Sequence, residues 1–87
     1  MTERDPGFGS ESAPAFRPLR EIRAEHLLSI RELAQLAGVA PSTIYLLEAG
    51  RRTPRLSVVR RLAAALGVDP LSVSEFRRAI RAAAKPH

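Results

Sequence analysis

The chain of 87 residues has no cysteine and only two histidines, His26 and His87, which lie far apart in the sequence. Disulfide bonds and thiolate-bound metals are therefore excluded, and two distant imidazoles are too few for a metal site. The sequence also lacks a nucleophile beside a base, a cluster of metal ligands and a glycine-rich phosphate loop. We therefore expect neither a cofactor nor an enzyme.

Long apolar runs are also missing. The longest, LAAALGV at residues 62–68, is far shorter than the roughly 20 residues that a membrane-spanning helix needs. The opening residues carry acids and no apolar stretch of the kind found in signal peptides. We expect a soluble intracellular protein that does not bind membranes.

Charge divides the chain into two parts. Residues 1–16 hold three acids and one arginine, and they are rich in glycine, proline and serine without any periodicity. Such a composition predicts a flexible acidic tail. Residues 17–87 hold thirteen bases and six acids, a balance typical of nucleic-acid binders. An arginine-rich composition would also follow from a GC-rich genome, so charge alone does not decide the function.

The rest of the chain shows helical periodicity and no alternating strand pattern. Pro18 and Pro41 are suited to first helical turns, and Gly38 to a left-handed helix end. Ser29 with Glu32 has the spacing of a capping box. These signals predict an all-α domain over residues 17–87 with helices at 18–26, 30–37, 41–49, 57–66 and 70–84. Leu19, Ile22 and Leu27 are the expected apolar residues of the first helix.

The central stretch, residues 29–50, predicts two helices joined by a tight turn. Two steeply crossing helices approach closely only where a small residue lies at the crossing, and Ala34 has that position. Gly38 makes the turn, and Ile44 and Leu47 have the i, i+3 spacing that would hold the second helix against the first.

With these residues in view, the sequence resembles the helix-turn-helix family of phage repressors and Cro proteins, the XRE family. The matching residues are Leu19, Arg23, the 29–38 helix, Ser42, Thr43, Ile44, Glu48, Gly50, Pro54 and the LAAALGV segment. The resemblance implies a five-helix, lambda-repressor-like DNA-binding domain. In such domains the second helix of the motif lies in the major groove.

The resemblance also assigns roles to residues. Base-facing positions would be Pro41, Ser42, Tyr45 and Leu46. Phosphate contacts would come from Arg31, Gln35, Thr43, Arg51, Arg52, Thr53 and Arg55. Arg23 and Glu48 would form an ion pair between the first and third helices. Pro41 and Leu46 depart from the family pattern, because their side chains cannot hydrogen-bond to base edges.

The function implied is a sequence-specific, double-stranded DNA-binding transcriptional regulator, a repressor. We expect a cytoplasmic protein of bacterial or phage type that is associated with the nucleoid when bound. We expect a homodimer on DNA. The apolar face of the last helix is expected to close the core, and the alternative is that part of Phe76, Ile80 and Ala83 forms the two-fold dimer contact. The alternative is a protein-interaction module, such as an antitoxin or assembly adaptor, that uses Tyr45 and Leu46 against a protein partner.

Overall fold

The computed structural model describes residues 16–84, so the tail predicted for residues 1–16 lies outside the described residues except for Phe16. The described part contains five α-helices, one 3-10 helix and no strand. Their bounds are α2 Leu19–Glu25, α3 Ile30–Ala37, α4 Pro41–Glu48, α5 Leu56–Leu66, η1 Pro70–Ser72 and α6 Ser74–Ala84. The predicted all-α, five-helix fold is confirmed. None of these helices is long and apolar enough to cross a membrane.

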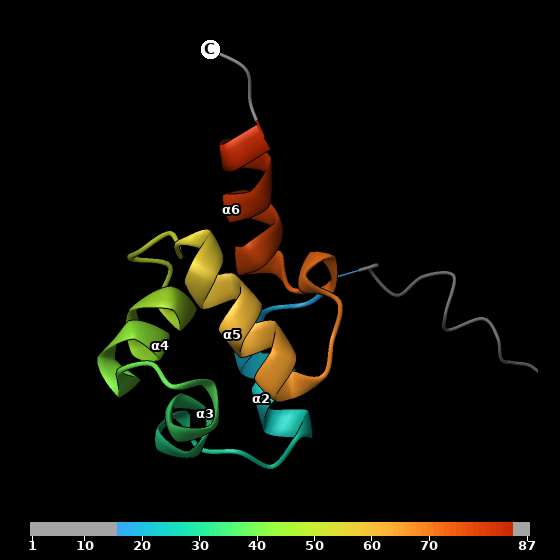
Figure 1. The fold of residues 1–87 in the computed structure, drawn as a ribbon. Helices are drawn as coiled ribbons and strands as arrows, with labels where there is room; N and C mark the ends of the chain where they lie inside the picture. The colour runs from blue at the N-terminus through green and yellow to red at the C-terminus, as the bar shows by residue number, and fades with distance from the viewer. Residues whose placement is uncertain (1–15, 85–87) are drawn as a thin grey trace, which may run out of the picture.

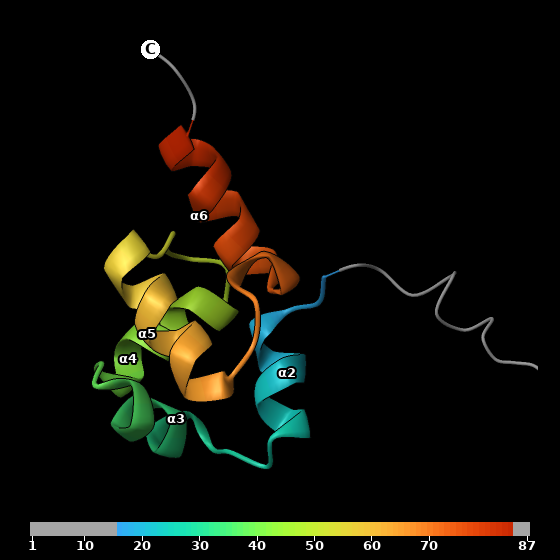
Figure 2. The same ribbon diagram turned by 45° about the vertical axis from the view of Figure 1, so that its right-hand side comes forward.

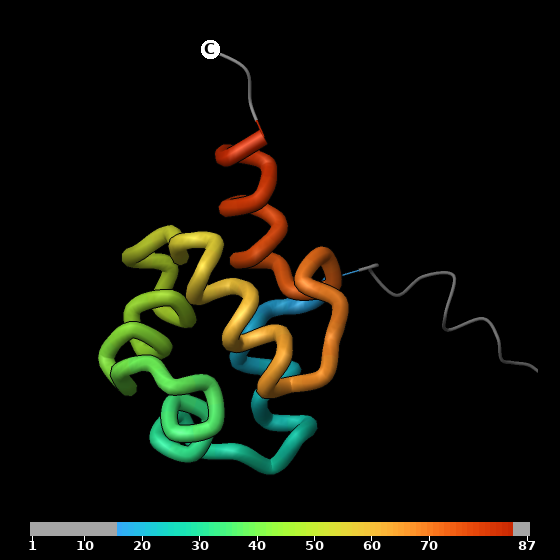
Figure 3. Tube along the Cα trace, viewed as in Figure 1, coloured from blue at the N-terminus to red at the C-terminus, as the bar shows by residue number. Residues whose placement is uncertain are grey.

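The helices surround α5, which runs through the middle of the domain (Figure 1). α3 packs against both α4 and α5, and α2 packs against α4. α6 contacts α5 and η1 at its first turns, and its far end points away from the other helices (Figures 2 and 3). α3 lies at the opposite end of the domain from the tip of α6, and α4 lies at an intermediate height (Figures 1 and 2).

One cluster of apolar side chains joins all five helices. Its buried members are Leu19, Ile22, Leu33, Ala34, Ala37, Ile44, Leu47, Val59, Leu62, Ala63, Leu66, Val73, Phe76 and Ala79. Burying a side chain of leucine or phenylalanine size contributes about 1.5–3 kcal/mol, so this cluster is the main source of stability. Phe76 is completely buried within it, which removes Phe76 from the possible dimer surface and leaves Ile80 half-buried and Ala83 exposed.

The ends of α3 follow from local sequence. The Ser29 hydroxyl accepts from the Glu32 N–H at 3.0 Å, and the Glu32 carboxylate accepts from the Ser29 N–H at 2.8 Å. This reciprocal pair is a complete capping box. At the other end Gly38 has φ of 71°, a left-handed conformation that costs glycine little. The helix is therefore bounded on both sides by residues that only a few amino acids could replace.

The last predicted helix, 70–84, is divided in the structure. Asp69 accepts from the Leu71 N–H, but the turn that it caps is the short 3-10 helix η1, and Val73 is extended. The backbone of Arg17 explains the break, because its N–H donates to Ser72 O and its C=O accepts from the Ser74 N–H. Val73 is fully buried between these two bonds. Contacts with a distant segment thus override the local helical pattern.

Leu27 also differs from the prediction, because it does not join the core. Its side chain is 89% exposed, and its φ of 57° makes it the non-glycine residue with positive φ in the described part of the chain. The left-handed conformation of Leu27 after α2 is accompanied by a side chain that points away from the core. Leu28 packs against the core instead.

Glycine should therefore suit position 27 better than leucine. Leu27→Gly removes the left-handed strain and loses almost no packing, so the free energy of unfolding should rise by about 1 kcal/mol. Urea unfolding followed by far-ultraviolet circular dichroism measures the change. Leu36→Gly is the control: Leu36 is exposed but helical, and the substitution should lower stability by about 1 kcal/mol. An equal loss in both variants would contradict the strain assigned to Leu27.

Candidate nucleic-acid interface

The turn between α3 and α4 fixes how the two helices meet. The N–H groups of Gly38 and Val39 both donate to Ala34 O, at 2.9 and 3.0 Å. Ala34 itself is buried, and Ile44 and Leu47 of α4 are completely inaccessible. Because these two side chains point inward, the opposite side of α4 faces outward along the whole helix.

The first residues on this outward side form a shallow depression, here called the α3–α4 hollow. Pro41, Ser42 and Tyr45 of α4 line it together with Ile30 and Arg31 of α3. Tyr45 is 59% exposed. The structure thus brings three of the four expected base-facing residues together with one expected phosphate contact. Leu46, the fourth, is half-buried and does not line the hollow.

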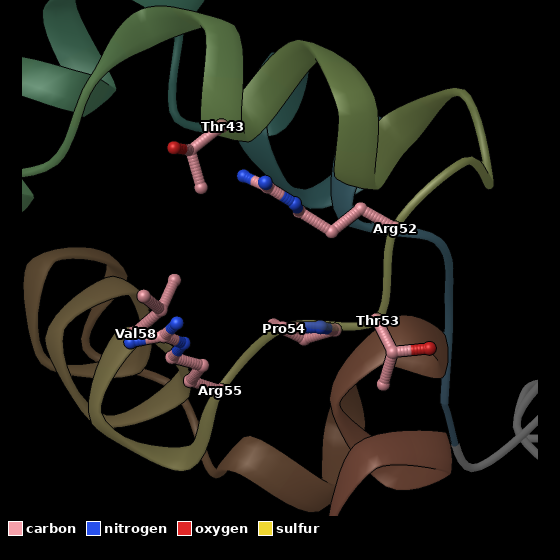
Figure 4. Close-up of a pocket in the computed structure, with 6 residues that line it drawn as sticks. All are labelled: Thr43, Arg52, Thr53, Pro54, Arg55 and Val58. Atoms are coloured by element: carbon pink, nitrogen blue, oxygen red, sulfur yellow. The ribbon is translucent and has the colours of Figure 1, made fainter.

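A second depression, here called the loop pocket, lies between α4, the loop after it and the start of α5. It has a volume of about 340 Å³ and is lined by Thr43, Arg52, Thr53, Pro54, Arg55 and Val58. Arg52 extends from the loop toward Thr43, and Arg55 lies across the gap beside Val58 (Figure 4). The Thr53 hydroxyl points away from this gap (Figure 4). Two guanidinium groups and the side chain of Thr43 therefore border a space that is large enough for a phosphate group.

The electrostatics around the loop pocket favour an anion. Residues 51–61 contain five arginines and no acid. All five arginines are exposed, and none forms an ion pair with an acid in the range 16–84. Arg55 is also the N-cap residue of α5 and does not cap that helix with its side chain. The first N–H groups of α5, at the positive end of the helix dipole, thus add to the positive potential.

The remaining candidates lie apart from both depressions. Gln35 and Arg51 are exposed but line neither of them. Arg61 has a contact that the sequence did not indicate: its Nη1 donates to Gly38 O at 3.1 Å and so closes the carbonyl end of α3. Ile30, Pro54 and Val58 were also missed as lining residues. Ile30 could have been predicted from the sequence, because it is the first residue of α3, the same place that the expected base-facing Pro41 has in α4.

Arg23 and Glu48 form a bidentate ion pair between α2 and α4. Arg23 Nε donates to Glu48 Oε2 at 2.7 Å and Nη2 donates to Oε1 at 2.9 Å. Arg23 Nη1 also donates to Leu28 O at 3.0 Å. The hydrogen bonds to Glu48 raise the pKa of Arg23 above its ordinary value, and burial opposes this rise. Only 15% of the Arg23 side chain and 8% of the Glu48 side chain are exposed, so the pair is a nearly buried link that orients α4.

Within residues 16–84 no three histidine, cysteine, aspartate or glutamate side chains gather in a way that could hold a metal ion. The candidate interface consists of the exposed side of α4, guanidinium groups and hydroxyls. Such a surface suits a nucleic acid, which presents negatively charged phosphates and base edges that side chains can contact.

Comparison with known proteins agrees with this arrangement. A family model described as Helix-turn-helix, of the XRE type, matches residues 19–73, from the start of α2 to the residue after η1. The chain belongs to this helix-turn-helix family, which confirms the resemblance drawn from the sequence. No solved structure matches the chain significantly.

Two curated relatives are similar to the chain. The uncharacterized HTH-type transcriptional regulator RghRB of Bacillus subtilis is 37% identical over 57 residues, which cover 64% of this chain and 41% of that protein. An uncharacterized HTH-type transcriptional regulator of Methanothermobacter thermautotrophicus is 47% identical over 49 residues, covering 56% of this chain and 71% of the relative. The matched region spans about two fifths of the Bacillus protein, so the likeness concerns the helix-turn-helix part of that relative.

Breaking the Arg23–Glu48 pair should be costly. Glu48→Ala leaves a nearly buried guanidinium without its partner and should lower the free energy of unfolding by about 3 kcal/mol. Arg23→Ala should cost a similar amount. The double variant should lose less than the sum of the two single losses, because it leaves no unpaired charge. Urea unfolding of the four proteins measures this coupling.

Glu21→Ala is the control, because Glu21 pairs with Arg17 at the surface. Such exposed pairs add little stability, so this variant should unfold almost as the parent does. Strict additivity of the Arg23 and Glu48 substitutions would contradict a direct link between α2 and α4.

Proposed function

We propose that this protein is a sequence-specific regulator of transcription, a repressor, that binds double-stranded DNA with α4 in the major groove. The observation that carries the proposal is the open outward side of α4, bordered by arginines that pair with no acid of residues 16–84. A major groove admits one α-helix, and the N-terminal residues of a recognition helix contact base edges. Both curated relatives are named as transcriptional regulators, which supports the same role here.

The loop pocket is proposed to hold a backbone phosphate. Arg52 and Arg55 supply charge, Thr43 supplies a hydroxyl, and the first turn of α5 supplies backbone N–H groups. Helix N-termini and guanidinium groups are common phosphate ligands because both present donors to a negative charge. Such a contact fixes the position of α4 on the duplex and carries no sequence information of its own.

Arg51 and Arg31 extend the same basic surface and are proposed as further phosphate contacts. Both are exposed, one after α4 and one in the first turn of α3. The proposed phosphate contacts therefore come from both sides of α4. Gln35 and Thr53 remain weaker members of this group.

The protein is proposed to act in the cytoplasm as a homodimer on palindromic DNA. Ile80 and Ala83, on the part of α6 that extends from the domain, are partly or fully exposed and could meet a second copy. A two-fold axis would put the two copies of α4 about 34 Å apart, one turn of the double helix.

A protein partner is the second candidate, favoured by the exposure of Tyr45. Leu46 is half-buried, however, so the exposed apolar area on α4 is smaller than the sequence suggested. If this candidate were correct, Leu46→Glu would abolish capture of the partner in a pull-down while salt-sensitive DNA binding survived.

The phosphate contacts can be tested by their salt dependence. Arg52→Ala and Arg55→Ala should each weaken binding to all duplexes and lower the slope of log affinity against log salt by about one unit. Fluorescence anisotropy with a labelled duplex at several salt concentrations measures both quantities. Arg78→Ala is the matched control, because Arg78 is an exposed arginine of α6 that lines neither depression.

Equal effects of all three substitutions would show that only net charge matters and would contradict the loop pocket as a phosphate site. Duplex binding no stronger at low salt than that of an uncharged helical control would contradict the whole proposal.

The bases that the protein prefers can be found by selection from a random duplex pool. The selected sites should be palindromes with half-sites one helical turn apart. Ser42→Ala should change the preferred base at one position of each half-site, since its hydroxyl is one of the few polar groups of the outward side. A pool with no enrichment after repeated rounds would contradict sequence-specific binding.

A further inference from the structure

The α3–α4 hollow is an unusual surface for reading bases, because most of its lining is carbon. Ile30, the ring of Pro41 and the ring of Tyr45 make up its apolar part. The side chains of Ile30 and Pro41 can neither donate nor accept a hydrogen bond, and Pro41 lacks a backbone N–H as well. Polar groups come only from Ser42, Arg31 and the Tyr45 hydroxyl.

Hydrogen-bond readout would need donors or acceptors where this surface has none. The edge of a guanine or adenine pressed against Pro41 would lose its bonds to water without replacement, which costs free energy. The major groove presents one apolar feature among its base edges, the methyl group on C5 of thymine. The methyl group of 5-methylcytosine occupies the same position on the cytosine ring.

The location of the hollow fits such a group. Pro41 and Ser42 are the first two residues of α4, and Ile30 and Arg31 are the first two of α3. The hollow thus lies where the N-terminal ends of both motif helices meet, and the N-terminal residues of a recognition helix are those that reach base edges. Tyr45, one turn later, closes one side.

We propose that the α3–α4 hollow is a receptor for the C5-methyl group of a pyrimidine in the major groove, so that Pro41, Tyr45 and Ile30 determine sequence specificity by apolar contact. This inference rests on the proposed DNA binding and names the group that is read. Arg31 and Ser42 form the polar edge of the same hollow and bond to the neighbouring backbone or base.

The test removes or adds single methyl groups in the duplex recovered by selection. Each thymine is replaced in turn by uracil, which deletes only the methyl group, and in a second series each cytosine is replaced by 5-methylcytosine. At the contacted position, thymine to uracil should weaken binding about fourfold, the value of one buried methyl group. If the methyl group read is that of 5-methylcytosine, the second series should instead contain a position at which binding becomes about fourfold tighter.

Tyr45→Ala opens one side of the hollow and should abolish that methyl dependence. Leu36→Ala is the matched control: its side chain is 62% exposed against 59% for Tyr45, it belongs to α3, and it does not line the hollow. This variant should keep the fourfold ratio. Pro41→Ala is a second test variant and should reduce the ratio, because alanine covers less of the methyl group.

Two results would overturn the inference while leaving DNA binding intact. One is a full set of uracil and 5-methylcytosine duplexes that all bind as the parent duplex does. The other is a methyl effect that persists unchanged in Tyr45→Ala, which would assign it to the shape of the DNA instead of the hollow. Failure to select any duplex would refute the proposed function itself, and the inference with it.

Discussion

The outward surface of this domain depends on the packing of α4 against α3, which Ala34 and Gly38 make possible. Ala34 is small enough to lie at the crossing, and its carbonyl accepts from both residues of the turn. Ile44 and Leu47 are then completely buried. A helix of eight residues has little stability of its own, so tertiary contacts must hold α4. Arg23 holds the last turn of α4 through its ion pair with Glu48, and Arg61 donates a hydrogen bond to the carbonyl of Gly38 in the turn before α4.

Most of the fold could be predicted because its signals are local. The Ser29–Glu32 capping box, the left-handed Gly38 and the spacing of Ile44 and Leu47 each act within a few residues. The two errors arose where distant or geometric constraints decide. Val73 is drawn into an extended conformation by hydrogen bonds from its neighbours to Arg17, more than fifty residues earlier. Leu27 was counted with the apolar side of the first helix, but its backbone adopts the left-handed conformation after α2 and its side chain is exposed.

The kinds of residue in the candidate site could be predicted from the sequence, but not which of them line the same depression. The resemblance named Thr43 and Ser42 as neighbours on one helix, yet the structure assigns them to different depressions, one beside α5 and one beside α3. Sequence spacing gives the angle of a residue around its own helix, but not which other helix lies next to it. Val58 was missed for this reason, since it becomes a lining residue only where the start of α5 comes near α4 across the loop pocket.

In the proposed mode of DNA binding the two depressions have separate tasks, one contacting phosphate and one contacting bases, and this division accounts for the departure of Pro41 from the family pattern. Phosphate contacts supply affinity that does not depend on sequence, and the arginines of residues 51–61 are proposed to provide much of it. Discrimination can then rest on a few weak, short-range contacts, because it needs only a difference in affinity between sites. Apolar contacts of this kind lose about a quarter to a half of their energy over a gap of about 0.5–1 Å. A surface that reads bases without many hydrogen bonds therefore requires a rigidly held α4, and the Arg23–Glu48 pair and the Gly38 turn provide that rigidity.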